Sequence, residues 1–165
     1  MSGEEAESLF SRLDEQARKS GYNLNPDRDF TMELMDGLLT NLRRYGYMAC
    51  PCRLADGERE LDLDIICPCD YRDADLNEYG ACYCGLYVSD EVRDGERELT
   101  AVPERRPPDP VDRHGGDRGK NGPITGKLEL PVYRCRVCGY LCAREEPPGK
   151  CPICGVSADR FQRFM

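Results

Sequence analysis

The fold is decided by residues 45–88, which read YGYMACPCRLADGERELDLDIICPCDYRDADLNEYGACYCGLYV. This stretch holds six of the eleven cysteines, arranged as the triplets Cys50–Cys52, Cys67–Cys69 and Cys82–Cys84, with 14 and then 12 residues between them. Two cysteines one residue apart form only a strained disulfide ring, so each triplet is expected to direct at least one sulfur toward a shared group. Two zinc sites would need eight ligands, whereas one cluster needs four. The sequence therefore predicts a four-cysteine cluster with a redox dithiol beside it.

A second cysteine pattern lies near the C-terminus, where Cys135 and Cys138 form one Cys-x-x-Cys pair and Cys151 and Cys154 form another. Twelve residues separate the two pairs. This spacing predicts a tetrahedral site in which four thiolates bind one metal ion, and by itself it fits zinc as well as iron. Cys142 lies outside both pairs, and we expect no role for it.

The residues around this second pattern resemble a rubredoxin, in particular the short form appended to rubrerythrins. The stretches that carry the resemblance are Tyr133, Cys138-Gly139-Tyr140, Cys151-Pro152-Ile153-Cys154-Gly155 and Phe161. The resemblance implies one mononuclear iron that relays single electrons, with zinc as the alternative metal.

Two amphipathic helices are predicted ahead of the first triplet. Ser2 and Glu5 have the spacing of a capping box, and the apolar residues that follow recur at helical intervals up to Gly21. Asn25 and Pro26 are predicted as the N-cap and first position of the second helix, which ends near Gly46. Each helix has one apolar face, so both are expected to pack on residues 45–88.

Two shorter elements are expected inside the triplet region. Asp70–Tyr79 is predicted as a short helix that Gly80 closes, whereas the alternating stretch Leu61–Ile66 fits a strand or a helix equally well. Asp70, Asp73, Asp75 and Glu78 form an acidic run, which we interpret as a solvated surface rather than a docking face.

The segment from Pro103 to Gly126 has five prolines and five glycines in 24 residues and predicts a linker. The domains are therefore expected at 1–102 and 128–165, joined by a linker at 103–127. The fold class that follows is a mainly α N-terminal domain with an iron–sulfur site, plus a small β-rich rubredoxin-like module that needs a metal to fold.

Charge and hydropathy exclude several functions. The net charge of −8 disfavours binding to nucleic acid or to anionic lipid, and no apolar stretch reaches the length of a membrane helix. The acidic N-terminus is unlike a secretory signal, so we expect a cytoplasmic protein. Residues 56–100 carry 14 acidic and 4 basic groups, whereas the C-terminal part is mildly basic.

The triplets and their surroundings resemble the catalytic subunit of ferredoxin:thioredoxin reductase, whose signature is two CPC triplets followed by CHC. The resemblance covers roughly residues 5 to 95. Besides the cysteines it rests on the stretches Asn25-Pro26-Asp27, Tyr45-Gly46-Tyr47, Cys52-Arg53, Ile66-Cys67-Pro68-Cys69 and Gly80-Ala81-Cys82-Tyr83-Cys84-Gly85.

Carried over by position, the resemblance implies that Cys52 attacks the partner's disulfide and that Cys84 is held against the cluster. The ligands of a four-iron four-sulfur cluster would be Cys50, Cys67, Cys69 and Cys82. The implied activity is the ferredoxin-dependent reduction of a protein disulfide, such as that of a thioredoxin. The alternative is a non-catalytic protein whose two centres only relay electrons to another enzyme.

Two features depart from the family pattern. Tyr83 stands where the family has a histidine, and the gaps between triplets differ from those of the plant type. The small second subunit of plant-type enzymes has no counterpart here, so the rubredoxin-like module is expected to act as an internal electron carrier, within one chain or in a homodimer.

Overall fold

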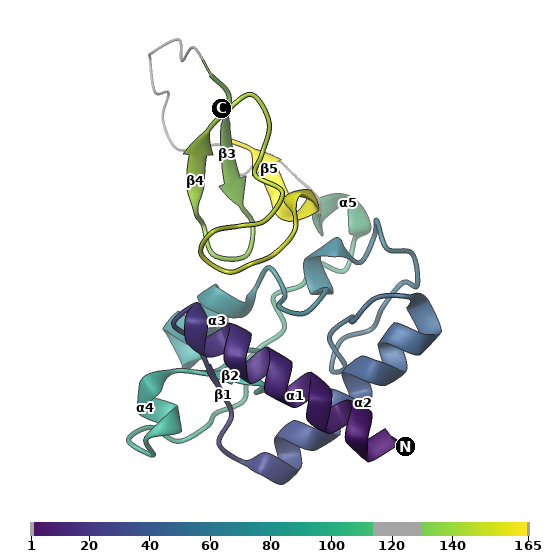
Figure 1. Ribbon diagram of the computed structural model, residues 1–165, viewed down its shortest axis with the longest axis vertical. Helices are drawn as coiled ribbons and strands as arrows, with labels where there is room; N and C mark the ends of the chain where they lie inside the picture. Colours follow the sequence, from purple (N-terminus) through teal and green to yellow (C-terminus); the bar gives the residue numbers. More distant parts are fainter. Residues whose placement is uncertain (1, 114–129, 165) are drawn as a thin grey trace. The chain divides into compact units, whose positions relative to one another are not determined.

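In the computed structural model, residues 2–113 and 130–164 are described, and the chain divides into two compact units, Met1–Arg106 and Pro107–Met165. The first unit is mainly helical, and the second contains a small antiparallel sheet (Figure 1). This confirms the predicted fold class. None of the described helices has the length and apolar character needed to cross a membrane.

The first unit is built on two long helices, α1 (Ser2–Lys19) and α2 (Arg28–Tyr45), which pack against each other. The buried apolar side chains of α1 recur at helical spacing: Ala6, Leu9, Leu13 and Ala17. On α2 the buried stripe is Thr31, Leu34, Met35 and Leu38. Burial of these stripes supplies the hydrophobic stabilisation that holds the two helices together.

The start of α2 differs from the prediction. The N-cap is Asp27, whose side chain accepts a hydrogen bond from the Phe30 amide, so the helix begins two residues later than Asn25-Pro26 implied. The Asn25 side chain instead accepts from the Asp27 amide and donates to the Gly85 carbonyl. Asn25 therefore fixes the entry to α2 against the turn that follows the third triplet.

Short backbone pairings bring the three triplets together. Ala49 forms an antiparallel bridge with Ile66, and the amides of Cys50 and Cys67 donate to the carbonyls of Ile65 and Met48. The third triplet follows α3 (Arg72–Tyr79) and leads into β2 (Tyr87–Val88), which pairs antiparallel with β1 (Asn23–Leu24). A short helix, α4 (Asp90–Arg93), follows β2.

The predicted helix Asp70–Tyr79 and the ambiguous stretch Leu61–Ile66 lie between these pairings. The predicted helix is α3, which starts at Arg72 rather than at Asp70 and ends, as predicted, at Gly80 in the left-handed conformation (φ 78°). The ambiguous stretch forms a 3-10 turn, η1 (Leu63–Ile65).

Part of the predicted linker lies within the first unit. Residues 103–106, which we call the linker root, pack on the first unit through Glu104, Arg105 and Arg106. Further along the chain, Pro110–Arg113 form α5. The rest of the predicted linker, from residue 114 on, lies outside the described residues.

The second unit contains a three-stranded antiparallel sheet in the order β4-β3-β5. Its strands are β3 (Val132–Cys135), β4 (Leu141–Ala143) and β5 (Phe161–Arg163), and the 3-10 turn η2 (Ala158–Arg160) precedes β5. Figure 1 shows β3 between its two neighbours. The buried residues of this sheet and its loops are few, chiefly Cys135, Val137 and Cys151, so a bound metal is needed to complete the core.

Candidate functional site

A buried pocket lies where the three triplets meet. Five of its lining residues are cysteines, namely Cys50, Cys67, Cys69, Cys82 and Cys84. The others are two arginines and two tyrosines: Arg53, Arg72, Tyr83 and Tyr87. The structure thus brings the four cysteines predicted as cluster ligands to one enclosed space, with one member of the predicted dithiol beside them.

Cys84 lies at the centre of the sulfur group. Its Sγ is 3.6 Å from Cys82 Sγ, and its thiol also interacts with Cys50 and Cys52. These hydrogen bonds, together with burial, raise the pKa of Cys84 well above its ordinary value. Cys84 is therefore a buried, protonated thiol that contacts both a predicted ligand and its predicted redox partner.

Cys52 differs from the other five cysteines of the triplets because it is exposed. The hydrogen bond from Cys84, aided by the positive charge of Arg53, outweighs partial burial and lowers the pKa of Cys52 to about 7. A thiolate is the nucleophilic form of cysteine, so Cys52 is both accessible and reactive near neutral pH.

The predicted ligands differ from one another in their pKa shifts. Burial raises the pKa of Cys69 to about 12 and that of Cys67 well above its usual value, and the neighbouring sulfurs act in the same direction. A hydrogen bond from Cys84 instead lowers the pKa of Cys82 to about 7. A metal ion binds cysteine as the thiolate, so binding of a metal centre here would displace the protons of these thiols.

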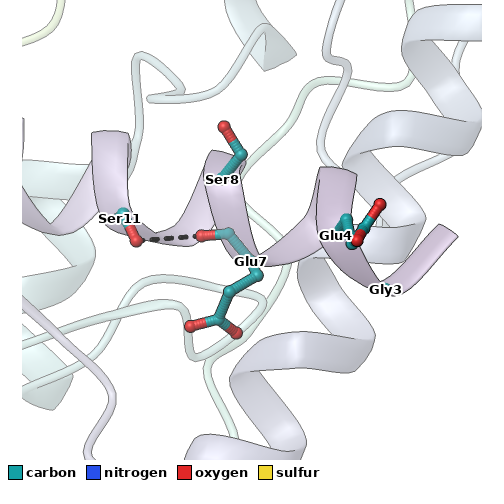
Figure 2. A pocket seen from close by; sticks show the side chains of 5 residues that line it. All are labelled: Gly3, Glu4, Glu7, Ser8 and Ser11. Carbon is teal, nitrogen blue, oxygen red and sulfur yellow. Dashed lines mark hydrogen bonds between the residues drawn. The ribbon is translucent and has the colours of Figure 1, made fainter. Parts of the chain in front are cut away.

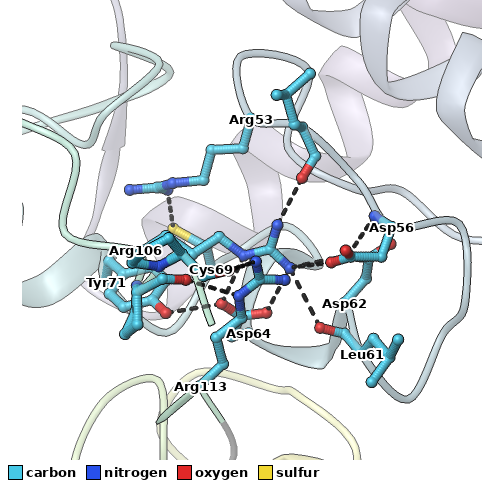
Figure 3. A network of polar contacts seen from close by, with 12 residues as sticks. Arg53, Asp56, Leu61, Asp62, Asp64, Cys69, Tyr71, Arg106 and Arg113 are labelled. Atoms are coloured by element: carbon cyan, nitrogen blue, oxygen red, sulfur yellow. Dashed lines mark hydrogen bonds and ion pairs between the residues drawn. The ribbon is translucent and has the colours of Figure 1, made fainter. Parts of the chain in front are cut away.

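Two buried arginines support the same assignment. Arg53 Nη1 donates to Cys69 Sγ at 3.3 Å, as Figure 3 shows, and Arg53 and Arg72 both line the pocket. Among the described residues, neither Arg53 Nη2 nor Arg72 Nη2 has a hydrogen-bond partner. A buried guanidinium whose N–H groups lack acceptors is expected beside an anionic group. A four-iron four-sulfur cluster ligated by four thiolates is such a group. The residues present therefore fit a four-iron four-sulfur cluster.

A charged network lies next to the pocket (Figure 3). Arg106 of the linker root donates to Asp62 at 2.9 Å and to Asp64 at 3.0 Å, and all three side chains are almost fully buried. Tyr47 donates to Asp62 at 2.6 Å, and Tyr71 donates to Asp64 at 2.7 Å. The same network lowers the pKa of Asp62, since the hydrogen bonds it accepts outweigh the effect of burial.

The acidic run is only in part the solvated surface that we expected, because Glu78 is exposed whereas Asp75 is not. Asp75 is fully buried and accepts a hydrogen bond from Arg105 of the linker root at 2.6 Å, and Arg105 also pairs with Glu78. The physical reason is charge: the acidic excess of residues 56–100 is met by the adjacent arginines Arg105 and Arg106. The sequence analysis missed this contact because it assigned Arg105 and Arg106 to a linker on composition alone. The signal that could have found it is the pairing of the acidic excess in residues 56–100 with these arginines.

The second unit brings its four predicted metal ligands together. The Sγ atoms of Cys135, Cys138, Cys151 and Cys154 all lie within 4.8 Å of one another. The amide of Gly139 donates to the Cys135 carbonyl and that of Gly155 to the Cys151 carbonyl, each at 2.9 Å, and both glycines have positive φ. Two equivalent tight turns thus present four sulfurs to one point, which defines a mononuclear metal site.

The thiols of this site interact strongly with one another. A hydrogen bond from Cys154, 3.7 Å away between sulfurs, lowers the pKa of Cys135 to about 5, while the pKa of Cys154 rises. Burial raises the pKa of Cys138 to about 11. Cys142 lies on β4 opposite Tyr133, and it is not one of the four.

A shallow hollow on the exposed side of α1 has no part in this chemistry. Figure 2 shows its lining residues, Gly3, Glu4, Glu7, Ser8 and Ser11, and the Ser11 hydroxyl donates to the Glu7 carbonyl at 3.0 Å. No cysteine lines it. It is a solvated helix surface.

A helical unit with five cysteines around a buried pocket and a sixth exposed beside them, followed by a four-thiolate metal module, is the architecture of an iron–sulfur redox protein. Comparison with known proteins agrees: residues 2–104 match the model of the ferredoxin thioredoxin reductase catalytic beta chain, and residues 133–162 match the rubredoxin-like domain of rubrerythrin. The chain belongs to the ferredoxin thioredoxin reductase catalytic beta chain family, with a rubredoxin-like domain at its C-terminal side.

The C-terminal domain is also similar to part of a curated protein, reverse rubrerythrin-1 from Clostridium acetobutylicum. The two are 48% identical over 32 residues, which make up 19% of this chain and 18% of that protein. The likeness is therefore confined to the rubredoxin-like domain.

Proposed function

We propose that this protein is a cytoplasmic disulfide reductase that takes single electrons from a ferredoxin-type donor and reduces a protein disulfide, such as that of a thioredoxin. The observation that supports the proposal most directly is the contrast between Cys52 and Cys84. Cys52 is exposed and has a pKa of about 7, whereas its partner Cys84 is buried beside the predicted cluster ligands. One thiol is placed to meet a protein substrate and the other to resolve the product.

The chemistry assigned to this pair is thiol–disulfide exchange. The Cys52 thiolate attacks one sulfur of the substrate disulfide, which breaks the S–S bond, forms a mixed disulfide and releases the other substrate sulfur as a thiolate that takes up a proton. Cys84 then gives up its proton and attacks Cys52, which frees the second substrate thiol and leaves a Cys52–Cys84 disulfide. Two electrons and two protons restore the dithiol.

Reduction of the Cys52–Cys84 disulfide by one-electron donors needs a group that handles single electrons. Cys50, Cys67, Cys69 and Cys82 would hold a four-iron four-sulfur cluster in the pocket, a group whose chemistry is the transfer of single electrons. Because Cys84 contacts the ligands Cys50 and Cys82, it is the thiol placed to remain next to the cluster while Cys52 faces the substrate.

The rubredoxin-like domain is assigned the role of an internal electron carrier, with iron at its four thiolates and zinc as the alternative. The proposed division of the chain is 1–102, 103–127 and 128–165, in which the first residues of the linker, the linker root, pack on the first unit. A ferredoxin, which is commonly acidic, would meet the mildly basic C-terminal part more favourably than residues 56–100. Neither nucleic acid nor membrane is a partner in this proposal, and a homodimer is an alternative arrangement for the electron transfer.

The decisive test is Cys52→Ser in the full-length, anaerobically purified protein. We expect disulfide reduction to fall to background while the visible spectrum still bleaches on addition of a one-electron donor, because the cluster ligands are untouched. Cys142→Ser is the matched control, since it removes a cysteine outside both groups, and it should keep wild-type activity. Survival of disulfide reduction in Cys52→Ser would contradict the proposal.

Metal analysis provides the second measurement. One cluster and one thiolate-bound iron require about five irons and four acid-labile sulfides per chain. Four irons with one zinc would retain the reductase and make the C-terminal site structural. If the wild type loads both centres yet never reduces a protein disulfide, the chain is a two-centre electron carrier instead.

A further inference from the structure

Arg53 is the residue next to the nucleophile that the mechanism above does not use. Its side chain is 1% exposed, although it carries a full charge. It lies between two aromatic rings, with its guanidinium carbon 4.4 Å from the Tyr83 ring centre and 4.9 Å from that of Tyr71. These contacts aim the planar group at Cys69, and Nη1 donates to Cys69 Sγ at 3.3 Å.

Two carboxylates balance this buried charge. Arg53 Nε donates to both oxygens of Glu104, at 2.9 and 3.1 Å, and Nη2 is 3.8 Å from Asp75 Oδ2. Glu104 belongs to the linker root, 51 positions further along the chain, and its side chain is 38% exposed. One guanidinium therefore joins a predicted cluster ligand to the segment that leads to the second unit.

We propose that Arg53 and Glu104 form a charged pair that sets the reduction potential of the cluster held by Cys50, Cys67, Cys69 and Cys82. Arg53 is a positioning residue here, since it acts on the cluster through the ligand sulfur. The inference rests on the cluster assigned under the proposed function. It adds a role for the linker root, which the sequence pattern assigned to the linker.

The direction of each effect follows from charge. Reduction adds an electron to the cluster, so a nearby cation and an N–H donor on a ligand sulfur favour the reduced form and raise the potential. An anion on the far side of the same cation opposes this. Removing the charge of Arg53 must therefore lower the potential, and removing the charge of Glu104 must raise it. A residue that only stabilises the fold would not give two shifts of opposite sign.

The test is an anaerobic redox titration of the iron-loaded full-length protein, followed by the visible and paramagnetic signals of the cluster. In Arg53→Gln we expect the equilibrium between oxidised and reduced cluster to move about tenfold toward the oxidised form, which is about 59 mV for one electron. Glu104→Gln should move it toward the reduced form. Arg53→Lys keeps the charge but loses the planar fork, so its shift should be smaller than that of Arg53→Gln.

Glu78→Gln is the matched control, because Glu78 is also an exposed glutamate that pairs with an arginine, but its partner is Arg105 instead of Arg53. It should leave the potential unchanged. If Arg53→Gln fails to bind iron, Glu104→Gln decides the question, since Glu104 is itself exposed and the glutamine keeps an oxygen that can accept from Arg53. Wild-type potentials in fully loaded Arg53 and Glu104 variants would overturn the inference. A wild type without labile sulfide would overturn the proposed function instead.

Discussion

Tyr83 occupies the middle of the third triplet, where a histidine would be an obvious proton donor. In the structure its ring stacks on the Arg53 guanidinium, and it lines the pocket where the three triplets meet. An aromatic ring over a buried cation is a favourable contact that needs no hydroxyl group. The ring of Tyr83, which packs on Arg53, thus explains the residue at this position without a role for its hydroxyl group.

Removal of the Tyr83 hydroxyl group tests this account. Loss of a general acid costs about 100-fold or more in rate, whereas Tyr83→Phe retains the ring and should keep disulfide reduction within about threefold of the wild type. The rate with a disulfide substrate at saturating donor is the measurement. A hundredfold fall, with iron content unchanged, would make Tyr83 the proton donor.

At the scale of elements, α2 is pressed against the first triplet. A Cβ atom placed on Gly37 would lie 2.7 Å from Cβ of Pro51, the residue between Cys50 and Cys52. Real Cβ atoms do not approach so closely, so any larger residue at Gly37 must push the triplet turn away from its position. The absence of a side chain at this one helical position lets the helix support the turn that carries Cys52.

Gly37→Ala should therefore destabilise the protein, although alanine usually stabilises a helix relative to glycine. Alanine stabilises an open helical position by up to about 1 kcal/mol over glycine, but here overpacking should lower the free energy of unfolding by about 1 to 2 kcal/mol. Gly3→Ala on α1 is the control, since a Cβ at Gly3 meets nothing within 4 Å. Chemical denaturation of both variants measures the difference, and equal stabilisation of the two would refute the close contact.

The linker root makes the stability of the first unit depend on pH through Asp62. Its carboxylate accepts hydrogen bonds from Tyr47, Arg106 and two backbone amides, which hold its pKa below the ordinary value despite burial. A lowered folded-state pKa means that the unfolded chain binds the proton first. The stabilisation from Asp62 is thus complete above the unfolded pKa of about 4 and is lost as the pH falls through the folded pKa.

Asp62→Asn should change how steeply the free energy of unfolding depends on pH. We expect the variant to be less stable at pH 7 by about 3 kcal/mol, because Arg106 loses a buried partner, and to lose less stability than the wild type between pH 5 and pH 3. Both proteins have the same cysteines, so the comparison isolates this carboxylate. Parallel stability curves for the two proteins across that range would show that Asp62 is not the group that titrates.

The whole molecule consists of two units with independent cores and different needs for metal. The core of the first unit includes the apolar stripes of α1 and α2, whereas that of the second consists largely of its ligand cysteines and their neighbours. The fold of the second unit should therefore depend on its metal far more than that of the first.

Removal of one ligand from the second unit tests this separation. In Cys151→Ser we expect one metal ion per chain to be lost and the second unit to unfold, while the helical circular dichroism from α1 and α2 remains. Metal analysis, acid-labile sulfide and far-ultraviolet circular dichroism are measured on the same sample. Loss of labile sulfide together with the single ion would show that the two centres are not independent.

The sequence by itself determined the long helices, the three triplets and the four-thiolate module. These follow from local features, namely helical periodicity, the αL glycines after helices and turns, and pairs of cysteines close along the chain. The start of α2 was missed by two residues because Asn25, Pro26 and Asp27 are all acceptable near an N-cap, and only the contact between Asn25 and Gly85 selects among them.

Tertiary structure alone decided which charges are buried. Asp75 and Arg53 look like ordinary surface residues in the sequence, yet both are enclosed, and the partners of Arg53 include Cys69 and Glu104. Glu104 is 51 positions from Arg53, and Arg106 is 42 positions from Asp64. Residues 103–106 were predicted as linker because the residues next to them in the sequence are rich in proline and glycine. The electrostatic energy that fixes them in place comes from residues that only the fold brings near.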